Sequence, residues 1–171
     1  GGSVEFDLGK DGALYGSLSA VGPNADIILT AERSLSLYGD LTAQRNVIIR
    51  AGTDAVAGEL SIYTAPESTI SVLGAGGKIE LIGKNDVHIN SVIGKVPEGD
   101  VQNLSAITIT SQTGTLKLMQ EAGQIETGAQ LNLTGKRLLV EGVVTSTRAT
   151  VSERQHEGAT CRQRHRHDQH K

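Results

Sequence analysis

A short apolar-x-apolar pattern recurs along the chain from Ile27 to Val144, with Gly, Asn, Asp, Ser and Thr between its occurrences. Typical examples are "DIILTA", "SLSLYGDLTA", "NVIIRAG", "KIELIGKND" and "QLNLTGK". The period of two and the return every ~6 to 13 residues predict many short strands, each with one apolar face, joined by tight turns. A helical interpretation fails because polar residues such as Thr108 and Thr110 alternate with apolar ones, and β-branched residues are enriched.

The spacing of the apolar pairs indicates how these strands are arranged. The pairs are Ile27/Leu29, Leu35/Leu37, Val47/Ile49, Leu60/Ile62, Ile70/Val72, Ile79/Leu81 and Val87/Ile89. Two successive intervals between them sum to about 20 residues, the length of one turn of a parallel β-helix. We therefore predict an all-β solenoid of about six coils. An antiparallel sandwich stays open as an alternative, although hairpin signals occur only at Asp11-Gly12.

Small residues recur near the ends of the predicted strands, at Ala31, Ala43, Ala51 and Ala65. In a stack of coils they are expected to form a column where the chain bends around a corner. The chain divides into an N-terminal extension or edge coil at residues 1–24, a β-helical repeat region at 25–146, and a disordered basic and His-rich tail at 147–171. An exposed end coil carries unpaired backbone groups, which favours a fragment of a larger protein.

Composition agrees with a narrow interior. The chain has no Trp, one Phe and three Tyr, so Val, Ile, Leu and Ala must fill the core. Residues 1–147 carry 10 Lys/Arg and 16 Asp/Glu, an acidic balance that argues against nucleic acid as a partner. The chain contains no run of 18 apolar residues, so no transmembrane helix is predicted. The start "GGSVEFDLGK" lacks the basic region and apolar run of a signal peptide. The lone Cys161 excludes an intramolecular disulfide and leaves the compartment open.

The tail contains the residue types that bind transition metals and phosphate. They are His156, Cys161, His165, His167, Asp168 and His170, and the cations Arg162, Arg164, Arg166 and Lys171. Their spacing matches no closed zinc site, and no aromatic residue interleaves the cations for base stacking. We interpret this segment as a solvated tail and assign no metal site.

Elsewhere the candidate chemistry is sparse. Glu80, Asp86 and Glu126 are the carboxylates that a β-helical polysaccharide-cleaving enzyme would need, but isolated charges on outer strand faces usually aid solubility. His88 alternates with Val87 and Ile89 and is expected to point outward. "GAGGK" at 74–78 lacks the Gly-Lys-Ser/Thr ending of a phosphate loop and is interpreted as a coil corner. No catalytic or cofactor-binding residue, no cofactor and no enzymatic activity are predicted.

Two longer stretches, "DIILTAERSLSLYGDLTAQRNVIIRAG" and "AITITSQTGTLKLMQEAGQIETGAQLNLTGKRLLVEG", resemble the repeats of filamentous haemagglutinin-like exoproteins, which include adhesins and contact-dependent inhibition proteins secreted by two-partner systems. The resemblance covers about residues 25–145. It implies a right-handed parallel β-helix that forms the shaft of a secreted or cell-surface bacterial protein. It also implies an outer-membrane transporter as the secretion partner, and a protein or glycan on a host or neighbouring cell as the target. The chain lacks a convincing "NPNG"-type secretion motif and a recognisable toxin domain.

Two other functions stay open at this stage. "YGDLTAQRNVIIRAG" and "LTGKRLLVEGVV" also resemble bactofilins, which implies a cytoskeletal β-helix that polymerises end to end in the cytoplasm. The third alternative is a β-helical polysaccharide-active enzyme, which requires a groove with clustered acids and bases.

Overall fold

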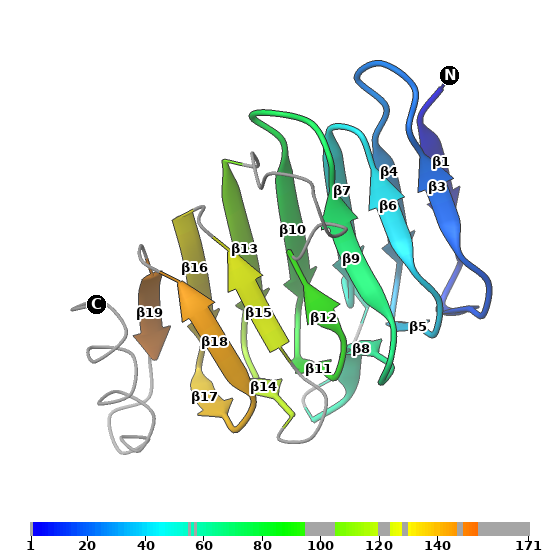
Figure 1. Ribbon diagram of the computed structural model, residues 1–171. Helices are drawn as coiled ribbons and strands as arrows, with labels where there is room; N and C mark the ends of the chain where they lie inside the picture. The colour runs from blue at the N-terminus through cyan, green and yellow to red at the C-terminus, as the bar shows by residue number, and fades with distance from the viewer. Residues whose placement is uncertain are drawn as a thin grey trace.

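The computed structural model of the chain is a parallel β-helix, in which each full coil contributes one strand to each of three sheets (Figure 1). It describes residues 2–54, 56, 58–94, 105–119, 124–127, 130–146 and 149–153. Every strand pairing within these residues is parallel and joins a strand to the third strand before or after it. The prediction of an all-β solenoid is confirmed, and the antiparallel sandwich is excluded.

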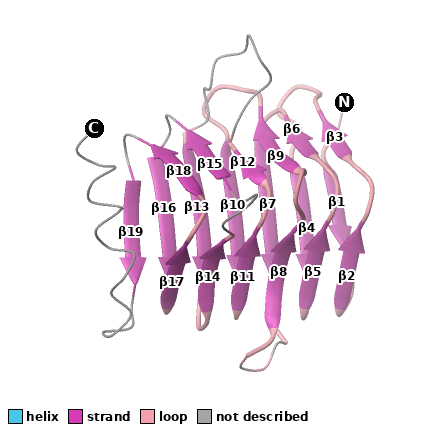
Figure 2. Cartoon of the chain, turned by 60° about the horizontal axis from the view of Figure 1, so that its bottom comes forward, coloured by secondary structure: helices cyan, strands magenta, loops and turns pink. Residues whose placement is uncertain are grey.

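The three sheets run the length of the solenoid, and Figure 2 shows their strands side by side. Sheet A contains β1 (Val4–Asp7), β4 (Ile27–Ala31), β7 (Asn46–Ala51), β10 (Lys78–Gly83), β13 (Ala106–Ser111), β16 (Gln130–Gly135) and β19 (Ala149–Glu153). Sheet B contains β2 (Asp11–Leu14), β5 (Ser34–Leu37), β8 (Leu60–Thr64), β11 (Asp86–Ile89), β14 (Thr115–Leu118) and β17 (Arg137–Val140). Sheet C contains β3 (Leu18–Ala20), β6 (Leu41–Ala43), β9 (Thr69–Val72), β12 (Val92–Ile93), β15 (Gln124–Thr127) and β18 (Val143–Ser146).

The core consists of columns of aliphatic side chains that stack from coil to coil. In sheet A one column is formed by Ile27, Val47, Ile79, Ile107 and Leu131, which are paired in register and completely buried. Alternate residues of the same strands face outward, as the burial patterns of β4, β10 and β13 show. Burial of each such side chain contributes about 1.5–3 kcal/mol, and no large aromatic residue is needed to fill so narrow an interior.

The number of strands per coil differs from the sequence-based prediction. Ile27 pairs with Val47, 20 residues later, but the coil between them holds three strands. The strand that the spacing missed is β6, whose inward residues are Leu41 and the small Ala43. Coils also vary in length, because Val47 pairs with Ile79, 32 residues on. Much of the added length lies in the connection from β7 to β8.

One predicted inward position is wrong. Leu60 is only half-buried, whereas Ser61 is completely buried. The register between β8 and β11 shifts here, because Asp86 pairs with Leu60 but Val87 pairs with Ile62. Ser61 is thus the extra residue of a β-bulge, and its Oγ accepts a hydrogen bond of 2.9 Å from the N–H of Asn85.

The predicted column of small residues is confirmed for one corner. Ala31 pairs with Ala51, Ala51 with Gly83, and Gly83 with Ser111, at the ends of four strands of sheet A. A Cβ on Gly83 would lie 2.5 Å from Val87 Cγ2, so the chain needs a small residue where it turns toward sheet B. The other two predicted members lie elsewhere: Ala43 ends β6 in sheet C, and Ala65 follows β8.

Strands that pair with the repeat region occur on both sides of residues 25–146. Residues 4–20 already form a complete coil of β1, β2 and β3, which supports the edge-coil interpretation of the N-terminal region. At the other end β19 pairs with β16 and extends sheet A into the segment that was predicted to be tail. Its only large apolar residue is Val151, so the sequence gives little sign of this strand. No helix among the described residues has the length and apolar character required to cross a membrane.

Candidate functional site

The carboxylates considered for enzymatic chemistry lie on three different sheets. Glu80 is in β10 of sheet A, Asp86 in β11 of sheet B, and Glu126 in β15 of sheet C. Glu80 Oε1 lies 2.8 Å from Arg50 Nη2, while Asp86 Oδ1 accepts a hydrogen bond of 2.8 Å from the N–H of Thr115. Glu80 and Asp86 thus take part in separate contacts between coils.

His88 points outward, as the alternation predicts, between the buried side chains of Val87 and Ile89. Burial lowers the pKa of His88, and the positive charge of Lys117 adds to this effect, whereas Asp86 opposes it. His88 pairs with Lys117 on one side and with Tyr63 on the other. It is therefore a half-buried surface histidine whose neutral form is favoured.

The tail residues that were considered as metal ligands and as a cationic patch, His156 to Lys171, lie outside the described residues. Among the residues that the structure does describe, no group of three or more His, Cys, Asp or Glu side chains is arranged to hold a metal ion. The "GAGGK" segment forms the connection from β9 to β10, which agrees with its interpretation as a coil corner.

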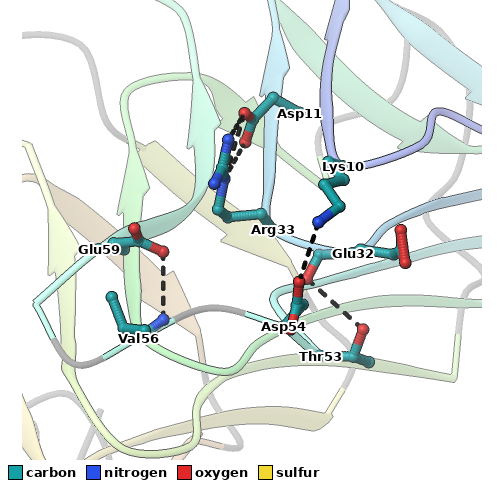
Figure 3. Close-up of polar contacts among 8 residues, drawn as sticks. All are labelled: Lys10, Asp11, Glu32, Arg33, Thr53, Asp54, Val56 and Glu59. Atoms are coloured by element: carbon teal, nitrogen blue, oxygen red, sulfur yellow. Dashed lines mark hydrogen bonds and ion pairs between the residues drawn. The ribbon is translucent and has the colours of Figure 1, made fainter.

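Charged side chains gather at the corner between sheets A and B near the N-terminal end (Figure 3). Arg33, in the β4–β5 connection, forms a two-pronged ion pair with Asp11 of the preceding coil. This contact holds the pKa of Asp11 well below its ordinary value and raises that of Arg33. Lys10 Nζ lies 3.6 Å from Asp54 Oδ2, two coils away. The corner is thus an exposed network of matched charges that links three coils.

The three tyrosines of the chain lie together along the outside of sheet B. The rings of Tyr15 and Tyr38 are stacked, with centroids 4.9 Å apart and planes 5° apart, and Tyr63 packs at a tilt against Tyr38 at 5.9 Å. Tyr15 is 75% exposed and Tyr38 is 42% exposed. We call this set the tyrosine ladder.

A repeated sequence explains the ladder and was missed in the sequence analysis. "LYG" occurs at 14–16 and again at 37–39, and Leu14 pairs with Leu37, so the two tyrosines are in register. The second glycine is needed for this stack, because a Cβ on Gly39 would lie 2.2 Å from the carbonyl oxygen of Gly16. A search for identical tripeptides about one coil apart would have found the ladder.

A solvent-open hollow of about 570 Å³ lies at the corner between sheets C and A. Three successive connections line it: β3–β4, β6–β7 and β9–β10. The polar residues among its lining are Asn24, Gln44 and Arg45, and the β9–β10 connection contributes Gly74, Ala75 and Gly76. Its volume lies in the range of small-molecule sites. No sequence motif marks this hollow, because its lining comes from three connections, in successive coils, that have unrelated sequences.

Comparison with known proteins adds no relative: no family model, no curated protein and no solved structure matches the chain.

Proposed function

We propose that the chain is a shaft segment of a secreted or cell-surface bacterial adhesin or related exoprotein. The observation that supports this most is the continuity of parallel pairing, coil after coil, from β1 to β19. A solenoid of this kind is stiff, since each coil is held by backbone ladders in three sheets and by stacked aliphatic columns. Stiffness and length are the properties needed to project a binding or effector region away from a cell.

The resemblance of the repeats to filamentous haemagglutinin-like exoproteins supplies the rest of the proposal. On that basis the protein leaves the cell through an outer-membrane transporter of a two-partner system and meets a protein or glycan on another cell. Adhesion, contact-dependent inhibition and virulence are the settings in which such shafts act. Polar and charged contacts between coils, such as those of Glu80 with Arg50 and of Asp86 with Thr115, add cohesion to such a shaft.

The flanking reading frame provides the decisive test. We expect the gene to continue with further repeats of the same apolar-x-apolar pattern beside a secretion domain. We also expect the full-length product to appear as a rod in electron micrographs of the cell surface. A complete frame that contains neither further repeats nor a secretion domain would refute the adhesin proposal.

A second candidate is a bactofilin-like filament, and the edge strands of the described residues favour it. Strands β1, β2 and β3 each have a single neighbour, as do β17, β18 and β19 at the other end of the described solenoid. Such edges are templates for pairing with another chain. Spontaneous filaments of the purified protein in electron micrographs would support this function, and a chain that stays monomeric at high concentration would count against it.

A proline substitution separates edge pairing from other kinds of aggregation. The N–H groups of Val4 and Leu8 donate to Asp26 and Thr30 in the next coil, so by alternation the N–H of Glu5 faces the open edge. Glu5→Pro removes that edge donor without breaking a bond inside the solenoid. If filaments form by edge pairing, Glu5→Pro should abolish them, whereas the control Glu5→Ala should not.

A further inference from the structure

One side of the hollow between sheets C and A is lined by Gly74, Ala75 and Gly76. This side is formed by the β9–β10 connection, where Gly74 lies directly against the preceding coil: a Cβ there would be 2.3 Å from the carbonyl oxygen of Gln44. Gly76 has a φ of +78°, a left-handed conformation that favours glycine. Gly74 thus allows the two coils to pack closely, whereas no atom lies within 4 Å of the position of a Cβ on Gly76, so the backbone there is open to close approach by a ligand.

Polar side chains around the hollow have unused hydrogen-bonding groups. Within the described part of the chain, the amides of Asn24 and Gln44 make no side-chain hydrogen bond, although both line the hollow. Arg45 directs Nε and Nη2 to Asp26, at 2.9 and 2.7 Å, and so keeps Nη1 for another acceptor. Each amide offers both donors and an acceptor, so the site can serve a ligand that itself both donates and accepts.

The position of these groups is fixed by the fold. Asn24 has a φ of 56° in the turn before β4, and the N–H of Gln44 donates to the carbonyl oxygen of Ala20 at 2.7 Å. The guanidinium of Arg45 is held by its two bonds to Asp26, which is 7% exposed. Binding therefore requires little ordering of the backbone or of the guanidinium, which reduces its entropic cost.

The charge of the hollow indicates the class of ligand. The positive charge of Arg45 is balanced by Asp26, so the site has no unpaired charge to attract an anion or a cation. Val21 and Pro23 add apolar surface beside the amides. A pyranose ring matches this combination, because its hydroxyl groups donate and accept around the rim while its C–H groups form apolar faces.

We propose that the hollow binds a neutral saccharide unit of a cell-surface glycan. The proposal rests on the adhesin function proposed above and deepens it: the shaft itself recognises sugar at a corner formed by three coils. Asn24, Gln44 and Nη1 of Arg45 hydrogen-bond the hydroxyl groups, and the ring lies over the open backbone at Gly76 in the β9–β10 connection.

Titration of the ¹⁵N-labelled protein tests the site. Lactose, N-acetyllactosamine and maltose serve as neutral probes, and 3′-sialyllactose serves as the acidic one. At least one neutral probe should shift the backbone signals of Gly74 and Gly76 and the side-chain amide signals of Asn24 and Gln44, with a dissociation constant on the order of 1 mM. Asn24→Gly keeps the left-handed backbone while removing the amide.

Two variants and a control complete the test. Asn24→Gly and Gln44→Ala should each weaken binding by about fivefold or more, a loss of the size expected for a hydrogen bond. Ser36→Ala truncates a polar side chain on the outside of sheet B and should leave the affinity unchanged. Unchanged melting temperatures establish that the variants are folded.

Three results would overturn the proposal: no shift with any neutral probe up to about 20 mM, binding of 3′-sialyllactose alone, or shifts confined to the tyrosine ladder. These failures concern the hollow and leave the shaft proposal standing. Conversely, saccharide binding in a protein whose flanking frame lacks repeats and a secretion domain would preserve the site and refute the adhesin function.

Discussion

The carboxylate of Asp26 accepts hydrogen bonds from both Nε and Nη2 of Arg45, at 2.9 and 2.7 Å, and so joins two successive coils at the corner between sheets C and A. The same carboxylate accepts the N–H of Asn46 at 3.0 Å. Asp26 is nearly buried, whereas the side chain of Arg45 is 49% exposed. The contact therefore links two coils. Because Asp26 is more buried than Arg45, the carboxylate has less access to water than the guanidinium if the pair is broken.

Removal of the guanidinium should destabilise the solenoid. Arg45→Met keeps the length of the side chain but leaves the Asp26 carboxylate with one hydrogen bond, so we expect a loss of about 1–3 kcal/mol in the free energy of unfolding. Arg50→Met, which breaks the more exposed pair with Glu80, should cost less than about 1 kcal/mol. Urea denaturation measures both, and equal losses would contradict the special role of the buried acid.

The contribution of the Asp26–Arg45 pair to stability should depend on pH. The hydrogen bonds from Arg45 hold the pKa of Asp26 below its ordinary value of 3.8, so the stabilisation is complete above that value and is lost as the pH falls through the lower pKa of the folded state. In Arg45→Met the pKa of Asp26 is no longer held down by the guanidinium, so this acid-dependent loss of stability should become smaller or disappear. Acid titration of the melting temperature of both proteins measures the difference.

His88 should make stability depend on pH in a separate and higher range. Burial lowers its pKa from 6.5 in the folded state, so the unfolded chain binds a proton more readily. Stability is therefore complete above about pH 6.5 and decreases as the pH falls from there through the folded-state pKa. His88→Gln should remove this step from the curve of melting temperature against pH. A step that persists in the variant would assign the effect to another group.

The inward and outward positions of a strand should differ sharply in their tolerance to truncation. Ile109 is completely buried in β13 and stacks between Leu81 and Leu133, so Ile109→Ala should cost about 2–5 kcal/mol. Thr110 faces outward in the same strand, and Thr110→Ala should cost less than about 1 kcal/mol. Chemical denaturation compares the two, and similar costs would mean that the alternation is assigned to the wrong faces.

These inward positions were the part of the fold that the sequence predicted best. Ile27, Val47 and Ile79 were placed correctly because period-two alternation follows directly from the pleat of a strand. The number of strands per coil was not predicted, because β6 presents only Leu41 and Ala43 to the core and its pattern is weak. Leu60 was misplaced because a bulge depends on the neighbouring coil, which a local pattern does not contain.

The candidate sites were predicted less well than the fold, for a physical reason. The hollow combines Asn24, Gln44 and Gly74, which come from the same corner of three successive coils, and these coils differ in length and in the sequence of their connections. No spacing rule brings such residues together. The tyrosine ladder, in contrast, follows from a tripeptide that recurs 23 residues later, close to one coil length.

Gly77 is expected to be required for the close packing of the β9–β10 connection against the preceding coil. A Cβ there would lie 1.8 Å from the carbonyl oxygen of Arg45, which is backbone and has little freedom to move. Gly77→Ala should therefore destabilise the protein by about 3 kcal/mol, at the upper end of ordinary substitutions. Gly16→Ala is the control, since no atom lies within 4 Å of its Cβ. Thermal melts distinguish the two, and a tolerated Gly77→Ala would show that the coils are less tightly stacked.

The tyrosine ladder should stabilise the N-terminal coils through Tyr38 more than through Tyr15. Tyr38 contacts a ring on each side, whereas Tyr15 contacts only one. Since each aromatic pair contributes about 0.5–1.5 kcal/mol, Tyr38→Ala should cost roughly twice as much as Tyr15→Ala in lost ring contacts. In the double variant the two losses should not add, because the pair between them is removed by either substitution. Urea denaturation of the four proteins gives the coupling energy, and near-ultraviolet circular dichroism reports the loss of stacking. Strictly additive losses would mean that the two rings do not interact in solution.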